Sequence, residues 1–301
     1  MSMKIAAGCA AILLVGCSPR EAASDGDRAE VVPRVTSASS PGYDDARIEE
    51  LRRQYDADPN LKAKTRAAGA MAAQPMPANK VALDRYLAEG QFEPLAMELS
   101  RGTTADEVER IMNWERAKVF EGGPLFLVVA YTRHLWLMSN NLPPPLREGL
   151  REGALSMALY GRALIEIDGL RCAEPDAASS RRKQHIAVHQ GLWEYAAQAT
   201  PATRERAKFA AVMTEYVTAP VRRNDTLLCQ GETTGDLSEI AEGLAAQQGR
   251  PLEKAPVQDH FGTTYLVPRA PPKFLPEADW RPRQDEVRAR LPSILSQQLG
   301  R

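Results

Sequence analysis

The amino-acid sequence predicts an all-α fold, built as a single multi-helix domain with one disulfide bond and an extended, proline-rich C-terminal arm. Three observations predict it. Apolar residues recur at helical spacing through most of residues 44–249. Two cysteines, Cys172 and Cys229, lie within this region. Seven prolines fall within residues 250–283, where the helical periodicity stops.

The first predicted helices are polar and have a narrow apolar stripe. Residues 44–56 (DDARIEELRRQYD) are rich in charged, helix-forming residues. Thr104 and Glu107 have the spacing of a capping box, in which the hydroxyl accepts a backbone N–H and the glutamate reaches back to the cap. Val108 and Ile111 follow on one helical face, so we expect a helix to begin at this box.

Two apolar segments predict the centre of the core. Pro124 precedes LFLVVAYTRHLWLM, which is long enough for a buried helix and too short to span a membrane. The prolines at 143–145 end this helix and begin the next, because proline is tolerated at the first helical position. Residues 153–167 (GALSMALYGRALIEI) are apolar on nearly every side, which is typical of a central helix. Its glycines are small enough for close helix contact.

Three more helices complete the predicted domain, which has about seven to nine helices in all. A polar helix is expected over 177–199. Thr200 and Pro201 provide an N-cap and a first helical residue for the next helix, which carries a regular apolar stripe. The last amphipathic helix is expected over 236–248.

The C-terminal arm, residues 250–301, is expected to be extended and to end in a helix near 284–299. One short strand-like piece, Thr263–Val267, interrupts it. We expect the arm to wrap the helical body. The alternative is that it stays disordered until a partner binds it.

The N-terminus has the three parts of a secretory signal peptide: Lys4, an apolar run and a small-residue exit. The run is too short to span a membrane. Its ending, Leu14-Val15-Gly16-Cys17, resembles the lipobox of bacterial lipoproteins. The resemblance implies that residues 1–16 are removed and that Cys17 becomes a lipidated N-terminus. A plain signal peptide with an incidental cysteine is the alternative.

The position after Cys17 is Ser18, where lipoproteins retained at the inner membrane commonly have Asp. The resemblance therefore implies an anchor in the outer membrane, on its periplasmic face. Residues 18–43 are small, charged and punctuated by proline, so we interpret 17–43 as the lipidated cysteine and a disordered tether. A coil of this length spans roughly 28 Å, enough to hold the helical domain of 44–249 away from the lipid headgroups.

The remaining cysteine pair, Cys172 and Cys229, predicts a disulfide bond, because an even count in an exported protein favours one. It would stabilise the fold by roughly 3–4 kcal/mol. A catalytic or metal-bound thiol pair is the alternative, which no C-x-x-C spacing supports.

The formal net charge of −1 argues against a nucleic-acid partner, because phosphate binding needs a basic surplus. A local basic run, Arg181, Arg182 and Lys183, belongs to a segment of net positive charge. Such a run is usually a solvated helix face; alternatively it binds an acidic protein or an anionic polymer. Trp193 and Tyr195 on the same predicted helix would strengthen that possibility.

His185 and His189 stand four residues apart and share one face of a predicted helix. Ile186 occupies the place of the zincin general base, and Glu194 is merely near in sequence, so hydrogen-bonded core histidines are the favoured interpretation. A metal or catalytic site is the alternative. Ser180 and Lys183 match S-x-x-K, but the other elements of penicillin-binding proteins are absent. We expect no cofactor.

These observations predict a non-catalytic lipoprotein, anchored through Cys17, that binds another envelope protein. An accessory protein of a secretion machine and an immunity or inhibitor protein both fit the size of the chain and its predicted location. The second hypothesis is a periplasmic hydrolase acting on cell wall or lipid, with His185 and His189 in its site.

Overall fold

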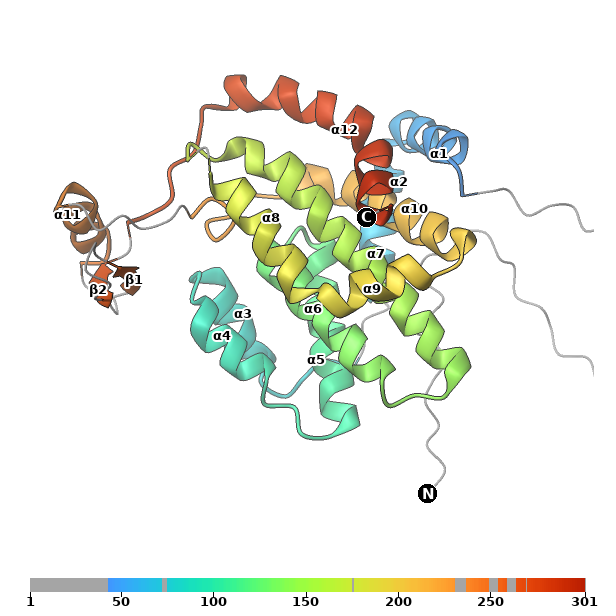
Figure 1. Ribbon diagram of the computed structural model, residues 1–301, viewed down its shortest axis with the longest axis horizontal. Helices are drawn as coiled ribbons and strands as arrows, with labels where there is room; N and C mark the ends of the chain where they lie inside the picture. Colours follow the sequence, from blue (N-terminus) through green and yellow to red (C-terminus); the bar gives the residue numbers. More distant parts are fainter. Residues whose placement is uncertain are drawn as a thin grey trace, which may run out of the picture.

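The computed structural model describes residues 43–71, 75–174, 176–230, 237–248, 254–258, 264–268 and 270–300. The chain is all-α over these residues, apart from one two-stranded sheet (Figure 1). The signal peptide, Cys17 and the predicted tether up to residue 42 lie outside the described residues. The elements are α1 (Asp45–Ala57), α2 (Pro59–Met71), α3 (Lys80–Ala88), α4 (Phe92–Leu99), α5 (Ala105–Phe120), α6 (Leu125–Ser139), α7 (Pro144–Asp168), η2 (Gly169–Arg171), α8 (Ala177–Val188), α9 (Gln190–Gln198), α10 (Pro201–Thr218), η3 (Ala219–Val221), α11 (Leu237–Ala246), β1 (Lys254–Gln258), β2 (Thr264–Pro268) and α12 (Glu277–Leu299).

Helix α7 is the centre of the body, as its apolar sequence predicts. It packs against α6 and α10, and also contacts α8, α9 and α12. Every residue from Ala154 to Ile165 is buried. Gly161 allows α8 to approach closely, since a Cβ there would lie 2.8 Å from Cε1 of His185. The remaining core is built around large buried side chains such as Trp114, Leu127 and Tyr160.

The predicted starts of α5, α7 and α10 are confirmed. Thr104 accepts the N–H of Glu107 while the Glu107 side chain accepts the backbone N–H of Thr104, which completes the capping box of α5. Proline occupies the first turn of α7. Thr200 accepts the N–H of Thr203 at the start of α10.

The predicted helix count is wrong, because the described chain has twelve α-helices rather than seven to nine. Helices α2, α3 and α4 are additional short elements. Residues 177–199, which were expected to form a single polar helix, form two helices, α8 and α9. The chain bends at His189, whose φ of −108° and ψ of 23° lie outside the helical region. Leu192 of α9 is buried in the core.

Within the described residues, the arm lies against the body over Ala270–Pro276 and again through α12. The N–H of Ala173 donates to the carbonyl of Lys273 at 2.9 Å, and the N–H of Leu275 to the carbonyl of Arg171 at 2.8 Å. The following helix, α12, begins at Glu277 rather than near 284 and contains two prolines. Packing on α7 and α10 compensates for the hydrogen bonds that these prolines remove.

The strand-like piece becomes β2, which pairs with β1 in antiparallel register, Val257 opposite Tyr265. The sequence analysis missed β1. Helix α11 packs on β2, and Figure 1 shows both beside the helical body. The predicted boundary at residue 249 therefore separates two elements that pack together. In the part of the chain described, no helix is long and apolar enough to cross a membrane.

Candidate functional site

The two histidines singled out by the sequence come together in the core. His185 and His189 are 3% and 4% exposed, and their ring centroids lie 4.7 Å apart. Nε2 of His185 lies 2.8 Å from the carbonyl oxygen of Ala158 on α7. A carbonyl can only accept, so this nitrogen carries the hydrogen. The His185 ring therefore joins α8 to α7 beside Gly161.

Both imidazoles are neutral at physiological pH. Burial, with the neighbouring positive charge, lowers the pKa of His185 to about 3. Burial lowers the pKa of His189 to about 4. Glu194 does not join the pair, because it is exposed and accepts a hydrogen bond from Gln190 at 3.1 Å. Within the described ranges, no three acidic, histidine or cysteine side chains are grouped to hold a metal ion.

The two aromatic residues of α9 are half-buried. The Trp193 ring lies 6.0 Å from that of His185. Tyr195 lies 6.0 Å from Trp136 of α6, and its hydroxyl donates to Glu148 of α7 at 3.1 Å. Both rings thus contact neighbouring helices instead of standing out from the surface.

The basic triplet is divided between internal contacts and solvent. Arg181 donates from Nε to the carbonyl of Leu227 at 2.9 Å and holds that loop against α8. Arg182 pairs with Glu166 at 2.7 Å. Lys183 is exposed. Two of the three basic side chains that were predicted to bind a partner therefore contact other groups of the chain. Partner binding at this triplet stays a prediction.

The predicted disulfide, Cys172–Cys229, is present, with Cα atoms 4.9 Å apart. It joins the end of η2 to the loop after η3 and encloses α8, α9 and α10. Both cysteines are buried. The bond therefore connects the exits of α7 and α10, two helices that pack against each other in the core.

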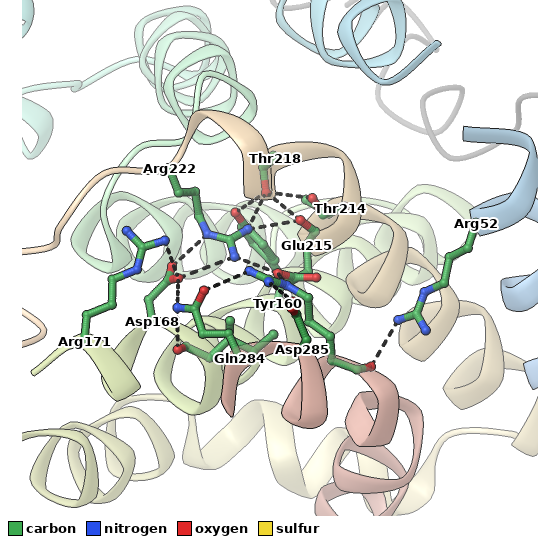
Figure 2. Close-up of polar contacts among 12 residues, drawn as sticks. Arg52, Tyr160, Asp168, Arg171, Thr214, Glu215, Thr218, Arg222, Gln284 and Asp285 are labelled. Atoms are coloured by element: carbon green, nitrogen blue, oxygen red, sulfur yellow. Dashed lines mark hydrogen bonds and ion pairs between the residues drawn. The ribbon is translucent and has the colours of Figure 1, made fainter. Parts of the chain in front are cut away.

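A buried polar cluster that was not predicted from the sequence lies where α7, α10 and α12 meet (Figure 2). Arg222 stands at its centre: Nε lies 2.7 Å from Asp168 at the end of α7, and Nη2 lies 2.6 Å from Glu215 on α10. Helix α12 adds two residues. Arg288 contacts Glu215 at 3.1 Å, and Gln284 donates to the carbonyl of Ile167 at 2.9 Å. We call these side chains, with Arg171 beside Asp168, the Arg222 cluster.

Each carboxylate of the Arg222 cluster is paired with two arginines. Burial opposes ionisation of Glu215, but the guanidinium groups of Arg222 and Arg288 outweigh it and lower its pKa. Burial alone would lower the pKa of Arg222, and the carboxylates of Asp168 and Glu215 raise it instead. Such groups exchange no protons near neutral pH. The cluster joins the described helices α7, α10 and α12 through paired charges.

A second buried pair joins α5 to α6. Nδ1 of His134 lies 3.0 Å and 2.9 Å from the two carboxylate oxygens of Glu115, which is completely buried. Burial raises the pKa of Glu115. Burial lowers the pKa of His134, but Glu115 outweighs it and the net shift is upward. A carboxylate that orients a histidine is also one part of many catalytic sites, yet no nucleophile is placed beside this pair in the contacts of the described residues.

The geometry thus offers two buried polar pairs and one charge cluster. No family model matches the chain, and neither curated proteins nor solved structures give a significant match. Function therefore has to be argued from the residues themselves.

One sequence signal could have revealed the Arg222 cluster. Glu215 lies between the apolar residues Met213 and Val217 of α10. A carboxylate inside an apolar stripe requires a buried cation. The sequence does not indicate which arginine supplies this cation. The tertiary structure decides it and brings both Arg222 and Arg288 to Glu215.

Proposed function

We propose that this chain is a lipoprotein anchored through Cys17 at the periplasmic face of a bacterial outer membrane, and that its helical body binds another envelope protein without catalysis. The observation that carries the proposal is the Cys172–Cys229 disulfide. Disulfides persist in oxidising compartments and are rare in the cytosol. The pairing thus agrees with the destination that the Leu14–Cys17 lipobox implies.

Binding is favoured over hydrolysis by the state of the histidines. A general base needs a pKa near the working pH and access to substrate. His185 and His189 are buried, and their pKa values lie near 3 and 4. Protein binding requires neither a titrating histidine nor a substrate pocket, and Val81, Met97 and Val188 leave apolar side chains at the surface, at 81%, 59% and 58% exposed.

The anchor is tested by labelling with a palmitate analogue in a diderm bacterium that expresses the full chain. We expect wild-type protein to incorporate label and to fractionate with outer membranes. Cys17→Ala should lose both properties. Cys9→Ala is the matched control, since Cys9 leaves with the signal peptide and its loss should change neither. Label retained by Cys17→Ala would contradict the proposal.

The binding role is tested by crosslinking in intact envelopes with a tagged chain. We expect a defined partner to be recovered with wild-type protein and its yield to fall with Cys17→Ala, because the anchor concentrates both proteins at one surface. A partner that belongs to a secretion machine indicates an accessory role, whereas a toxic effector indicates immunity. Hydrolysis of cell wall or lipid by purified protein, lost in His185→Gln, would favour the enzyme instead.

A further inference from the structure

Two turns at one end of the helical body carry no charged side chain. The first joins α6 to α7, and residues 135–146 (LWLMSNNLPPPL) contain no Asp, Glu, Lys or Arg. The second joins α9 to α10 within residues 195–203 (YAAQATPAT), which contain none either. The two turns are neighbours, because the Tyr195 ring lies 6.0 Å from that of Trp136 and its hydroxyl donates to Glu148 at 3.1 Å. We call these two segments together the uncharged end.

Apolar side chains stand out from the first turn. Leu137 is 47% exposed and Leu146 is 41% exposed. The prolines at 143–145, between them, are exposed as well. The turn is closed by Arg147, which donates from Nε and Nη2 to the carbonyl of Leu142 at 3.2 Å and 3.1 Å. The uncharged end therefore presents an apolar projection whose backbone is held in place.

The described chain begins at this same end of the body. The Tyr43 ring lies 5.1 Å from that of Phe209 on α10. One turn earlier on α10, Arg206 donates to Glu152 of α7 at 2.9 Å. Glu152 is six residues after Leu146, which is about 9 Å along the helix axis. Figure 1 accordingly shows the start of α1 on the same side of the body as both turns.

Tyr43 is also where the predicted tether ends. Residues 18–42 separate it from Cys17, and a coil of that length spans roughly 28 Å. The lipid on Cys17 is thus tied to the side of the body that carries the uncharged end. A lipid surface suits this end, because its apolar side chains leave water on contact and no charged group within the two segments has to be desolvated.

We propose that the uncharged end rests on the membrane surface, with Leu137, Leu146 and the prolines at 143–145 among the lipid headgroups. The body is then held by two contacts, the lipid on Cys17 and this end, and so has one orientation on the membrane. Helices α3 and α4, on the other side of the body in Figure 1, face away from the lipid. The inference rests on the proposed anchor and deepens it, since it states how the body lies on the membrane.

The test is site-specific fluorescence of the lipidated full chain, purified in detergent and reconstituted into vesicles of phosphatidylethanolamine and phosphatidylglycerol. Leu137→Cys and Leu146→Cys each receive a nitrobenzoxadiazole label. Val81→Cys and Met97→Cys are the matched controls, because both side chains are apolar and more exposed and lie on α3 and α4. We expect phospholipids that carry a nitroxide to quench the labels of the uncharged end at least twofold more than the control labels.

The parent chain without an added cysteine separates this inference from the anchor. Cys172 and Cys229 are bonded to each other, and an acylated Cys17 has no free thiol, so the parent should take up no label. Label on Cys17 would reject the anchor and the inference with it.

With a parent that takes up no label, the remaining outcomes concern the uncharged end alone. Equal quenching at all four positions, no quenching at any, or stronger quenching at the controls would overturn the inference and leave the anchor standing. A blue shift at the uncharged end without quenching would mean that a second copy of the chain covers it, which would overturn the lipid contact too.

Added charge checks the contact in a second way. Leu137→Asp with Leu146→Asp should lower the quenching of a label at Ala202→Cys, an exposed position of the other uncharged segment, at least twofold. Val81→Asp with Met97→Asp is the control and should leave that quenching unchanged. Both double variants alter exposed side chains, so their melting temperatures should stay within about 4 °C of wild type. Unchanged quenching in the first variant would overturn the contact.

Discussion

Asp225 caps helix α6 from one hundred residues further along the chain. Its Oδ2 accepts the backbone N–H of Leu125 at 2.7 Å, while Oδ1 accepts the N–H of Leu228 at 2.9 Å. The residue before α6 is Pro124, whose side chain cannot accept these hydrogen bonds. A buried carboxylate at a helix N-terminus is also favoured by the helix dipole. The loop that carries Cys229 thus completes a helix to which it is not adjacent in sequence.

Asp225→Ala should lower the free energy of unfolding by about 2–4 kcal/mol, because it removes a cap and leaves buried N–H groups without an acceptor. Urea denaturation at neutral pH measures it. Asp176→Ala is the matched control: Asp176 precedes α8, but its side chain makes no capping bond and is exposed. A change below about 0.5 kcal/mol is expected there. Equal losses in the two variants would contradict the capping role.

Arg222→Ala should lower the free energy of unfolding by about 3–5 kcal/mol, more than Asp225→Ala does. The reason is that it leaves Asp168 and Glu215 buried without their shared cation. The neighbouring Arg223→Ala provides the control, since Arg223 is exposed and should change stability by at most about 0.5 kcal/mol. Chemical denaturation of both variants separates the outcomes. A small loss for Arg222→Ala would mean that Arg288 alone is sufficient for Glu215.

Removal of the disulfide by Cys172→Ala with Cys229→Ala should cost roughly 3–4 kcal/mol, since 57 residues separate the cysteines. The measurement is urea unfolding of the double variant beside oxidised wild type. Reduced wild type is the internal control and should match the double variant. A local effect is expected as well: Gln230, next to Cys229, donates to the carbonyl of Ala270 at 2.9 Å, so amide exchange near Ala270 should accelerate more than exchange in α5. Uniform acceleration would contradict this local effect.

Stability should fall on acidification below about pH 6.5 because of the two core histidines. Their folded pKa values are lowered to about 3 and about 4, so the unfolded chain binds more protons. Their contribution is present above the unfolded pKa and is lost as pH falls to the folded pKa, about 4 for His189 and about 3 for His185. Between pH 6 and 5 the two histidines together should lower the free energy of unfolding by about 2 kcal/mol per pH unit.

His189→Gln tests this assignment, because glutamine does not titrate. The free energy of unfolding of this variant is measured at pH 7 to set the baseline. The slope of that free energy against pH, between pH 6 and 5, is then compared with the wild-type slope. The slope should fall by about half, with His185 supplying the remainder. An unchanged slope would place the acid sensitivity elsewhere.

Gly161→Ala should destabilise the contact of α7 with α8 by about 1–3 kcal/mol, because the new methyl group would lie 2.8 Å from His185. Gly149→Ala is the control on the same helix, where a Cβ would meet no atom within 4 Å. Alanine favours helix over glycine, so the control should be stabilised by up to about 1 kcal/mol. Thermal melting compares the two variants.

Local sequence patterns determined the helix starts, the central helix and the cysteine pair. The capping box at Thr104, the prolines before α7 and the apolar residues 153–167 act through neighbours in sequence, so they can be recognised without a fold. His185 and His189 were also recognised as a pair, since four residues make one helical turn. The lipobox at Cys17 has the same local character and remains a prediction.

Only the tertiary structure decided which charges are neutralised and by what. Asp225 reaches Leu125, Arg222 reaches Asp168, and Gln230 reaches Ala270 across distances that no sequence period encodes. The bend at His189 and the two prolines inside α12 likewise go against local helix preference, which packing against neighbouring helices outweighs. The physical reason is that burial makes an unpaired polar group costly. Folding must therefore place a partner beside each buried polar group, and the sequence does not indicate which residue that partner is.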